Sequence, residues 1–122
     1  MNQIPSTPVI VGKYHEFLKW LLPRVAKYPR AHRYTLGKHV EDKAIRIWEG
    51  LLRASYSKAD KLRILEQVNL ELEILRHALR LCHDLQLSNV KQYRYAAECL
   101  LEIGQQLGGW IRQQQRKTVA RP

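Results

Sequence analysis

Positively charged side chains are the residues whose number and spacing most clearly suggest a chemical role in this sequence. The chain of 122 residues carries 21 Lys and Arg against 11 Asp and Glu, which gives a formal net charge of +10. A field of that sign attracts polyanions, and nucleic acid is the commonest such partner. An acidic protein surface or anionic lipid headgroups would satisfy the same charge, so composition alone does not choose between them.

The cations are densest between residues 24 and 46. Only two acids, Glu41 and Asp42, interrupt this stretch. Its seven cations are Arg24, Lys27, Arg30, Arg33, Lys38, Lys43 and Arg46. Because Lys and Arg bind nucleic acid mainly by neutralising phosphates, we expect this stretch to form a phosphate-contacting surface.

An aromatic residue shares a predicted helical face with several cations. The residues within about 60° of one another on this face are Lys13, Trp20, Arg24 and Lys27. Aromatic and basic side chains interleaved in this way can stack a base while neutralising its phosphates. The alternative is that Trp20 is simply buried between subunits of an assembly.

Arg76 and Arg80 are two further candidates for phosphate contact. They belong to a polar wedge that also contains Glu73 and Asp84, with mixed charges at helical spacing. Such a pattern is usually a solvated face with weak pairs within one helix. If the wedge faces a channel, however, both arginines can reach a phosphate.

Catalytic and metal-binding patterns are missing from the sequence. It has no nucleophile elbow, no glycine-rich phosphate loop, no His-Glu-x-x-His and no paired Glu-x-x-His. The residues of a type that ligates metals are His77, Cys82, His83 and Cys99, but those at 77, 82 and 83 do not share a helical face. A Cys82–Cys99 disulfide would leave the thiols about 9 Å out of register. We therefore expect no enzyme, no metal and no cofactor.

The apolar pattern predicts an all-α fold that positions these side chains. We expect a helix at about 9–27, which Pro23 either kinks or restarts, and a second helix capped by Thr35 that ends near 54. A third helix should follow the capping pattern Ser57–Asp60 and reach Leu85, and a fourth should begin after Ser88 or Asn89. Residues 9–111 would form an antiparallel up-down-up-down four-helix bundle. Residues 1–8 are expected to be disordered, and 112–122 to be a frayed basic tail.

Two apolar rows run along the third predicted helix. The first is a bundle seam of Leu65, Val68, Leu72, Leu75, Leu79 and Cys82. The second lies roughly opposite and consists of Leu70, Ile74, Leu81 and Leu85. One bundle covers only one side of this helix, so the second row, hereafter the apolar row, predicts a homo-oligomer interface.

The sequence offers no sign of membrane insertion or export. No apolar run approaches the roughly 20 residues that span a bilayer, and the first eight residues lack the basic start and apolar core of a signal peptide. We therefore expect a cytoplasmic protein without a membrane partner.

Three segments carry a resemblance to a known family. They are Tyr28–Gly37 (YPRAHRYTLG), Lys91–Ala97 (KQYRYAA) and Glu102–Ile111 (EIGQQLGGWI). In order and spacing they resemble the accessory variability determinant (Avd) of diversity-generating retroelements. The residues that match its first and last motifs are Pro29, Arg30, His32, Arg33, Tyr34, Thr35, Leu36, Gly37, Gly108, Gly109 and Trp110, while Ala31 stands where a small polar residue is expected.

The resemblance implies a noncatalytic basic bundle that forms a barrel-like homopentamer. It also implies binding to a reverse transcriptase and to template RNA or cDNA, in support of mutagenic copying. The cations named above and Trp20 would then contact either the nucleic acid or the polymerase. A related four-helix-bundle family encoded in ribosomal RNA intervening sequences has a similar size and pattern. The alternative is therefore a basic protein-interaction module of that type, without a retroelement role.

Overall fold

The computed structural model describes residues 8–120, which are almost entirely helical. Its four long helices are α1 (Val9–Val25), α3 (Lys38–Tyr56), α4 (Lys61–Asp84) and α5 (Val90–Ala120). A short helix α2 (Arg30–His32) and a π-helical turn η1 (Arg33–Gly37) lie between α1 and α3. The expected all-α class is confirmed for the described residues, whereas the predicted disorder at the N-terminus lies outside them except for Pro8, which precedes α1.

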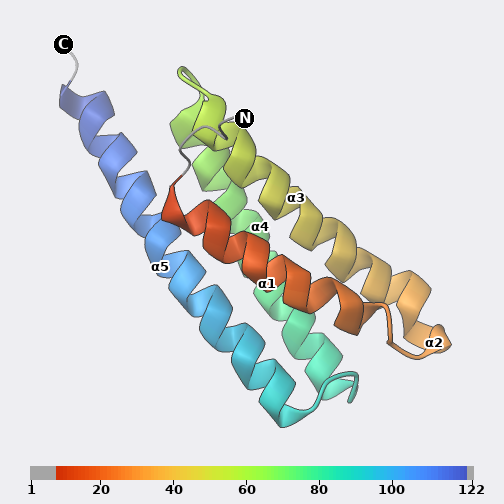
Figure 1. Ribbon diagram of the computed structural model, residues 1–122. Coiled ribbons are helices and arrows are strands. Elements are labelled where there is room, and N and C mark those ends of the chain that lie inside the picture. Colours follow the sequence, from red (N-terminus) through yellow and green to blue (C-terminus); the bar gives the residue numbers. More distant parts are fainter. Residues whose placement is uncertain (1–7, 121–122) are drawn as a thin grey trace, which may run out of the picture.

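The four long helices form the expected up-down-up-down bundle (Figure 1). Each helix runs antiparallel to the next along the chain, and α1 and α4 each pack against both α3 and α5. The order around the bundle is therefore α1, α3, α4 and α5. The side between α3 and α4 consequently lies across the bundle from the side between α1 and α5.

The seam predicted from the three-and-four spacing of α4 forms the centre of the core. All six of its residues are buried, and none is more than 6% exposed. Facing them are Tyr14 and Phe17 of α1, Ile47 and Leu51 of α3, and Leu100 of α5, all buried. The Tyr14 hydroxyl donates a 2.6 Å hydrogen bond to the Ala44 carbonyl, so burial of this polar group is compensated.

The start of the second predicted helix was wrong. Pro29 precedes a helical segment that begins at Arg30 and passes through the π turn into α3, so Thr35 lies inside helical structure. Its Oγ1 donates to the His32 carbonyl at 3.3 Å and does not cap a helix. A π turn accommodates one more residue than an α turn, and no simple periodicity indicates it. Pro23 neither restarts α1 nor ends it, because α1 continues from Val9 to Val25.

Residues 112–120 of the predicted frayed tail are helical, and residues 121–122 lie outside the described part of the chain. Helix α5 continues through residues 112–120, and in Figure 1 its end projects past the other helices. This segment contains no Gly or Pro, and its Arg, Gln and Lys residues favour helix even though most of them are exposed. At about 1.5 Å per residue, α5 is longer than α4 by roughly 10 Å.

The turn between α4 and α5 confirms one of the two caps proposed for the last helix. The Gln92 amide N–H donates to Asn89 Oδ1 at 2.7 Å, and the Asn89 amide N–H donates to Gln92 Oε1 at 3.0 Å. This reciprocal pair satisfies two otherwise unpaired donors at the start of α5. At the turn between α3 and α4, Ser57 Oγ accepts a hydrogen bond from the Asp60 amide at 3.1 Å, as the predicted capping pattern requires. Helix α4 itself begins only at Lys61.

Candidate polyanion-binding surfaces

The structure distributes the seven clustered cations over different surfaces. Arg24, Lys27 and Arg30 are exposed near the end of α1 and the start of α2, and Arg46 is exposed on α3. Lys38 is exposed as well, but its Nζ lies 2.9 Å from the Asp42 carboxylate. That hydrogen bond and charge raise the pKa of Lys38. A dense basic stretch of sequence is therefore not one continuous basic surface.

Arg46 takes part in a cluster that the sequence did not predict. Together with Arg53 of α3 and Arg63 of α4 it lines a cavity of about 250 Å³ between the two helices, here called the arginine groove. All three arginines are exposed, and the only ion pair they make within the described residues joins Arg63 to Asp60 at 3.4 Å. Arg53 lies seven residues after Arg46 on the same helical face, which is the one sequence signal for it.

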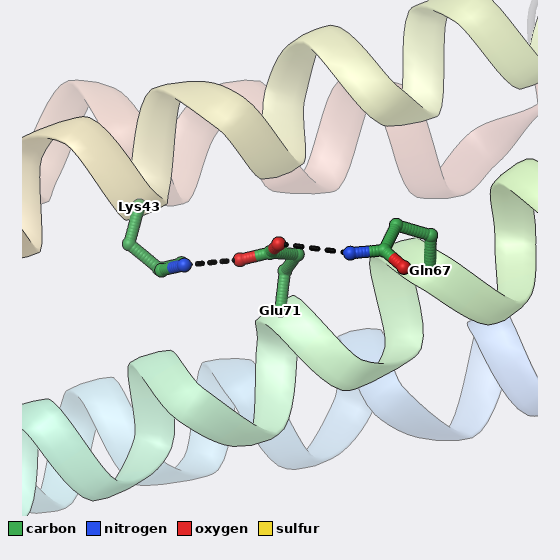
Figure 2. Close-up of polar contacts among 3 residues, drawn as sticks. All are labelled: Lys43, Gln67 and Glu71. Atoms are coloured by element: carbon green, nitrogen blue, oxygen red, sulfur yellow. Dashed lines mark hydrogen bonds and ion pairs between the residues drawn. The ribbon is translucent and has the colours of Figure 1, made fainter.

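The remaining polar wall of the arginine groove is an inter-helix network (Figure 2). Glu71 of α4 accepts hydrogen bonds from Lys43 Nζ of α3 and, at 3.1 Å, from Gln67 Nε2. The side chains of Lys43 and Glu71 are only 13% and 9% exposed. The hydrogen bond from Lys43 holds the pKa of Glu71 below its usual range against the opposing effect of burial, with further help from Gln67 and Arg46.

This network removes Lys43 from the exposed cations, because its charge is used to neutralise Glu71. It also leaves the groove lined by three guanidinium groups and a carboxylate that is already paired. The groove is therefore suited to an anion such as a phosphate, which guanidinium groups bind with directed hydrogen bonds.

The interleaving of Trp20 with cations is confirmed for Arg24. Its guanidinium carbon lies 4.4 Å from the centre of the indole ring, and its Nη1 donates to the Trp20 carbonyl at 2.8 Å. Trp20 is half-buried, with the ring centres of Tyr95 at 4.7 Å and Phe17 at 6.1 Å. Trp20 is thus part of an aromatic cluster at the edge of the core and only partly open to a ligand.

Lys13 is not part of this cluster. Its Nζ forms an ion pair with Glu102 of α5, across the contact between α1 and α5. Both side chains are substantially exposed, so we assign this pair a small stabilising role.

Arg33 is held within the link between α1 and α3. Its Nη1 donates to the Ala26 carbonyl at 3.4 Å, and its guanidinium lies 5.1 Å from the ring centre of Tyr34. Its Nε is buried. A Cβ on Gly37 would lie 3.3 Å from the His32 carbonyl oxygen, so this glycine permits close packing of the same link. The motif Tyr28–Gly37 therefore has a clear role in shaping the connection.

Arg76 and Arg80 behave differently although they lie one turn apart on α4. Arg76 is half-buried, and its Nη1 lies 2.8 Å from Glu73 Oε1, as expected for a pair within a solvated helical face. Arg80 is exposed and has no ion pair within residues 8–120. Arg80 therefore remains the better candidate of the two for an external anion.

The apolar row lies outside the core of the bundle, as its spacing predicts. Leu70, Ile74, Leu81 and Leu85 are between 37% and 55% exposed. Four large aliphatic side chains on α4 and at its end therefore remain partly open to solvent in the single chain.

The other candidate chemistry finds no site in the described part of the chain. No group of three or more His, Cys, Asp or Glu side chains is arranged to hold a metal ion there. Cys82 is buried, Cys99 is half-buried, and both are free thiols. None of the described helices is long and apolar enough to cross a membrane.

Comparison with known proteins places the chain in a family. A family model described as bAvd-like matches residues 8–114, which include α1 to α4 and most of α5. A search of curated proteins finds no match. The family match confirms the resemblance to Avd that the three sequence motifs indicated. With its four-helix architecture and this match over most of its length, the chain belongs to the bAvd-like family.

Proposed function

We propose that this protein is a noncatalytic accessory subunit of a diversity-generating retroelement. It binds the reverse transcriptase and nucleic acid, either template RNA or cDNA, and supports mutagenic reverse transcription in the cytoplasm. The polymerase chemistry belongs to the partner. The observation that carries the nucleic-acid part of this proposal is the arginine groove, where Arg46, Arg53 and Arg63 surround one cavity.

The geometry of the groove favours the nucleic-acid backbone as its ligand. Three arginines from two helices converge on a space where the one carboxylate is already paired with Lys43. Binding at such a site releases counterions from the polyanion, so affinity falls with salt and depends little on sequence. Arg80 and the cations at the end of α1 extend the basic surface to other sides of the bundle.

Self-association through the apolar row would multiply these contacts. We propose a homopentamer, in keeping with the family resemblance. Arg63 and Leu70 lie seven residues apart on one face of α4, so each added copy would place its arginine groove beside the interface. Weak sites linked in this way gain affinity through effective concentration. Because the basic surfaces lie on different sides of the bundle, one of them can hold nucleic acid while another holds the polymerase.

Salt-dependent RNA binding tests the nucleic-acid part of the proposal. Affinity for a structured RNA should fall steeply between low and physiological salt. The variant R46Q/R53Q/R63Q should bind more weakly and reduce the slope of log affinity against log salt by about 2 to 3, since each lost phosphate contact removes roughly 0.7 to 0.9. The control K58Q/K91Q/R94Q removes equal charge from exposed positions outside the groove.

Two outcomes would contradict the proposal. RNA binding that is unchanged between low and physiological salt would refute the phosphate mechanism. An equal loss of affinity in the groove variant and its control would refute the groove as the site.

Capture of the reverse transcriptase tests the polymerase part. The partner should be recovered by the tagged protein both before and after nuclease treatment if the two proteins touch directly. Recovery of an acidic partner together with no affinity for RNA would instead support the alternative, a protein-interaction module of the ribosomal intervening-sequence type.

A further inference from the structure

A second cavity lies near the turn between α4 and α5, across the bundle from the arginine groove. It has a volume of about 140 Å³ and is here called the Trp20 pocket. Its apolar lining comes from three helices, the α4–α5 turn and the link that follows α1. It consists of Trp20, Leu21, Tyr28, Leu79, Leu87, Tyr93 and Ala96. Its polar lining consists of Arg24, Lys27, Ser88 and Gln92.

The apolar part of the pocket is fixed in place. Leu21, Tyr28, Leu79 and Ala96 are all buried core residues. Tyr93 is held by a stacked contact with His83, whose ring centre lies 4.6 Å away at an interplanar angle of 7°. His83 in turn has its Nδ1 3.2 Å from the Ser88 carbonyl. A ligand entering the pocket would meet a preformed surface, so little side-chain entropy would be lost on binding.

The polar part of the pocket is positively charged. Arg24 and Lys27 are exposed, and neither forms an ion pair within residues 8–120. Arg24 is oriented by its hydrogen bond to the Trp20 carbonyl and by the indole ring beneath it. The lining contains no carboxylate. An apolar floor with a cationic rim matches a ligand that is flat and uncharged at one end and anionic at the other.

We propose that the Trp20 pocket binds one unpaired nucleotide, with the base inside and its phosphate at Arg24 and Lys27. This deepens the proposed function and rests on it. The cavity volume of about 140 Å³ favours one base over a larger ligand, since pockets for drug-sized ligands typically measure roughly 300 to 1,000 Å³. Ser88 and Gln92 supply the polar groups that the edge of a base requires.

The pocket gives the protein a preference for single-stranded segments. A base must leave its helix to enter, and unpaired bases do so at the lowest cost. Stacking tolerates any base because every base has an aromatic face. The arginine groove, by contrast, contacts only the backbone, so the two sites recognise different features of a nucleic acid.

The test uses the full-length protein, one fluorescent RNA probe and one mononucleotide competitor. The first is a single-stranded RNA that contains one 2-aminopurine, and the second is adenosine monophosphate. Binding of the RNA should quench the 2-aminopurine by stacking. Tyr93→Leu removes an aromatic wall without changing charge, whereas R24Q/K27Q removes the rim. The control K91Q/R94Q removes two exposed charges from the same end of α5, outside the pocket.

We expect quenching with the native protein and with K91Q/R94Q, and its loss with Tyr93→Leu. The affinity of Tyr93→Leu should fall about fivefold or more, because stacking of one base contributes at least about 1 kcal/mol. R24Q/K27Q should bind more weakly than its charge-matched control. Circular dichroism and thermal melting check that each variant is folded. Tyr93→Leu and R24Q/K27Q test the aromatic wall and the cationic rim separately.

The outcomes separate this inference from the proposed function. Tight RNA binding without quenching, or full quenching with Tyr93→Leu, would overturn the pocket and leave the accessory role standing. No RNA binding by any form would overturn the accessory role itself. Competition by the mononucleotide would extend the site to free nucleotides, and its failure alongside quenching would assign the pocket to a chain.

Discussion

Replacing Lys43 by methionine tests how the inter-helix network stabilises the bundle. The substitution keeps the unbranched shape of the side chain, shorter by one atom, but removes the cation that pairs with Glu71. Glu71 would then remain nearly buried, with only the Gln67 amide as a hydrogen-bond donor and Arg46 as a nearby charge. An ionised carboxylate without its main partner is costly in such a place.

The expected loss in the free energy of unfolding at pH 7 is about 3 kcal/mol. Breaking a buried ion pair by removing one partner costs roughly 3 to 5 kcal/mol, and the remaining contacts of Glu71 favour the lower end. For a chain of this size the melting temperature should fall by about 10 °C. The double variant K43M/E71M should recover most of that loss, since a well-packed apolar pair can replace a buried ion pair.

The pH dependence gives an independent measure of the same network. The pKa of Glu71 is lowered in the folded protein, so its contribution is present above the unfolded value of about 4.3 and is lost as pH falls through the folded pKa. Loss of the Lys43 hydrogen bond removes the main effect that lowers the pKa of Glu71, so this pKa rises relative to the native protein and protonation relieves the variant at a higher pH. The stability difference between the native protein and Lys43→Met should therefore be largest above pH 6 and shrink below pH 4.

Chemical denaturation at fixed protein concentration, repeated across this pH range, measures both effects. Lys38→Met is the matched control, because the Lys38–Asp42 pair is exposed and its loss should not change stability measurably. A loss below about 1 kcal/mol for Lys43→Met, or a difference that stays constant with pH, would refute the role assigned to the pair.

Three further predictions concern packing, capping and assembly. Gly50→Ala should destabilise the fold by about 1 to 3 kcal/mol in thermal melts, because the added Cβ would lie 2.5 Å from Val68 Cγ2, whereas Gly12→Ala meets nothing within 4 Å and should stabilise it by up to about 1 kcal/mol. A tolerated Gly50→Ala would show that α3 and α4 are less closely packed than described. Asn89→Ala should cost about 1 kcal/mol by removing the cap of α5, and an unchanged melting temperature would refute that cap. L70E/I74E should reduce the mass measured by light scattering, while the exposed-site control Val90→Glu should not, and retention of the parental mass would exclude the apolar row as the interface.

The core was predictable because burial leaves a periodic trace in the sequence. Leu65, Val68 and Leu72 follow the three-and-four spacing of a bundle seam, and all are buried. The same reasoning separated Leu70 and Ile74 from that seam, and both lie outside the core of the single bundle. The extension of α5 was missed because its residues carry no apolar stripe, although their intrinsic preference for helix sufficed to continue it.

The candidate sites were less predictable because their residues come from different helices. Arg63 joins Arg46 only through the packing of α3 on α4. Lys43 was counted among the exposed cations because its partner, Glu71, lies 28 residues further along the chain. Trp20 and Arg24, by contrast, are one turn apart on a single helix, and their association followed from local spacing. Sequence patterns therefore predicted sites within one helix better than sites between helices.

The π turn between α2 and α3 bears on how the length of this chain can change. A turn of this kind contains one residue more than the surrounding α-helix needs. Deleting one residue from Arg33–Gly37 would allow a single uninterrupted α-helix from Arg30 to the end of α3, with Val40 and Ala44 still facing inward. The connection can thus lose one residue locally while the remainder of the bundle keeps its alignment.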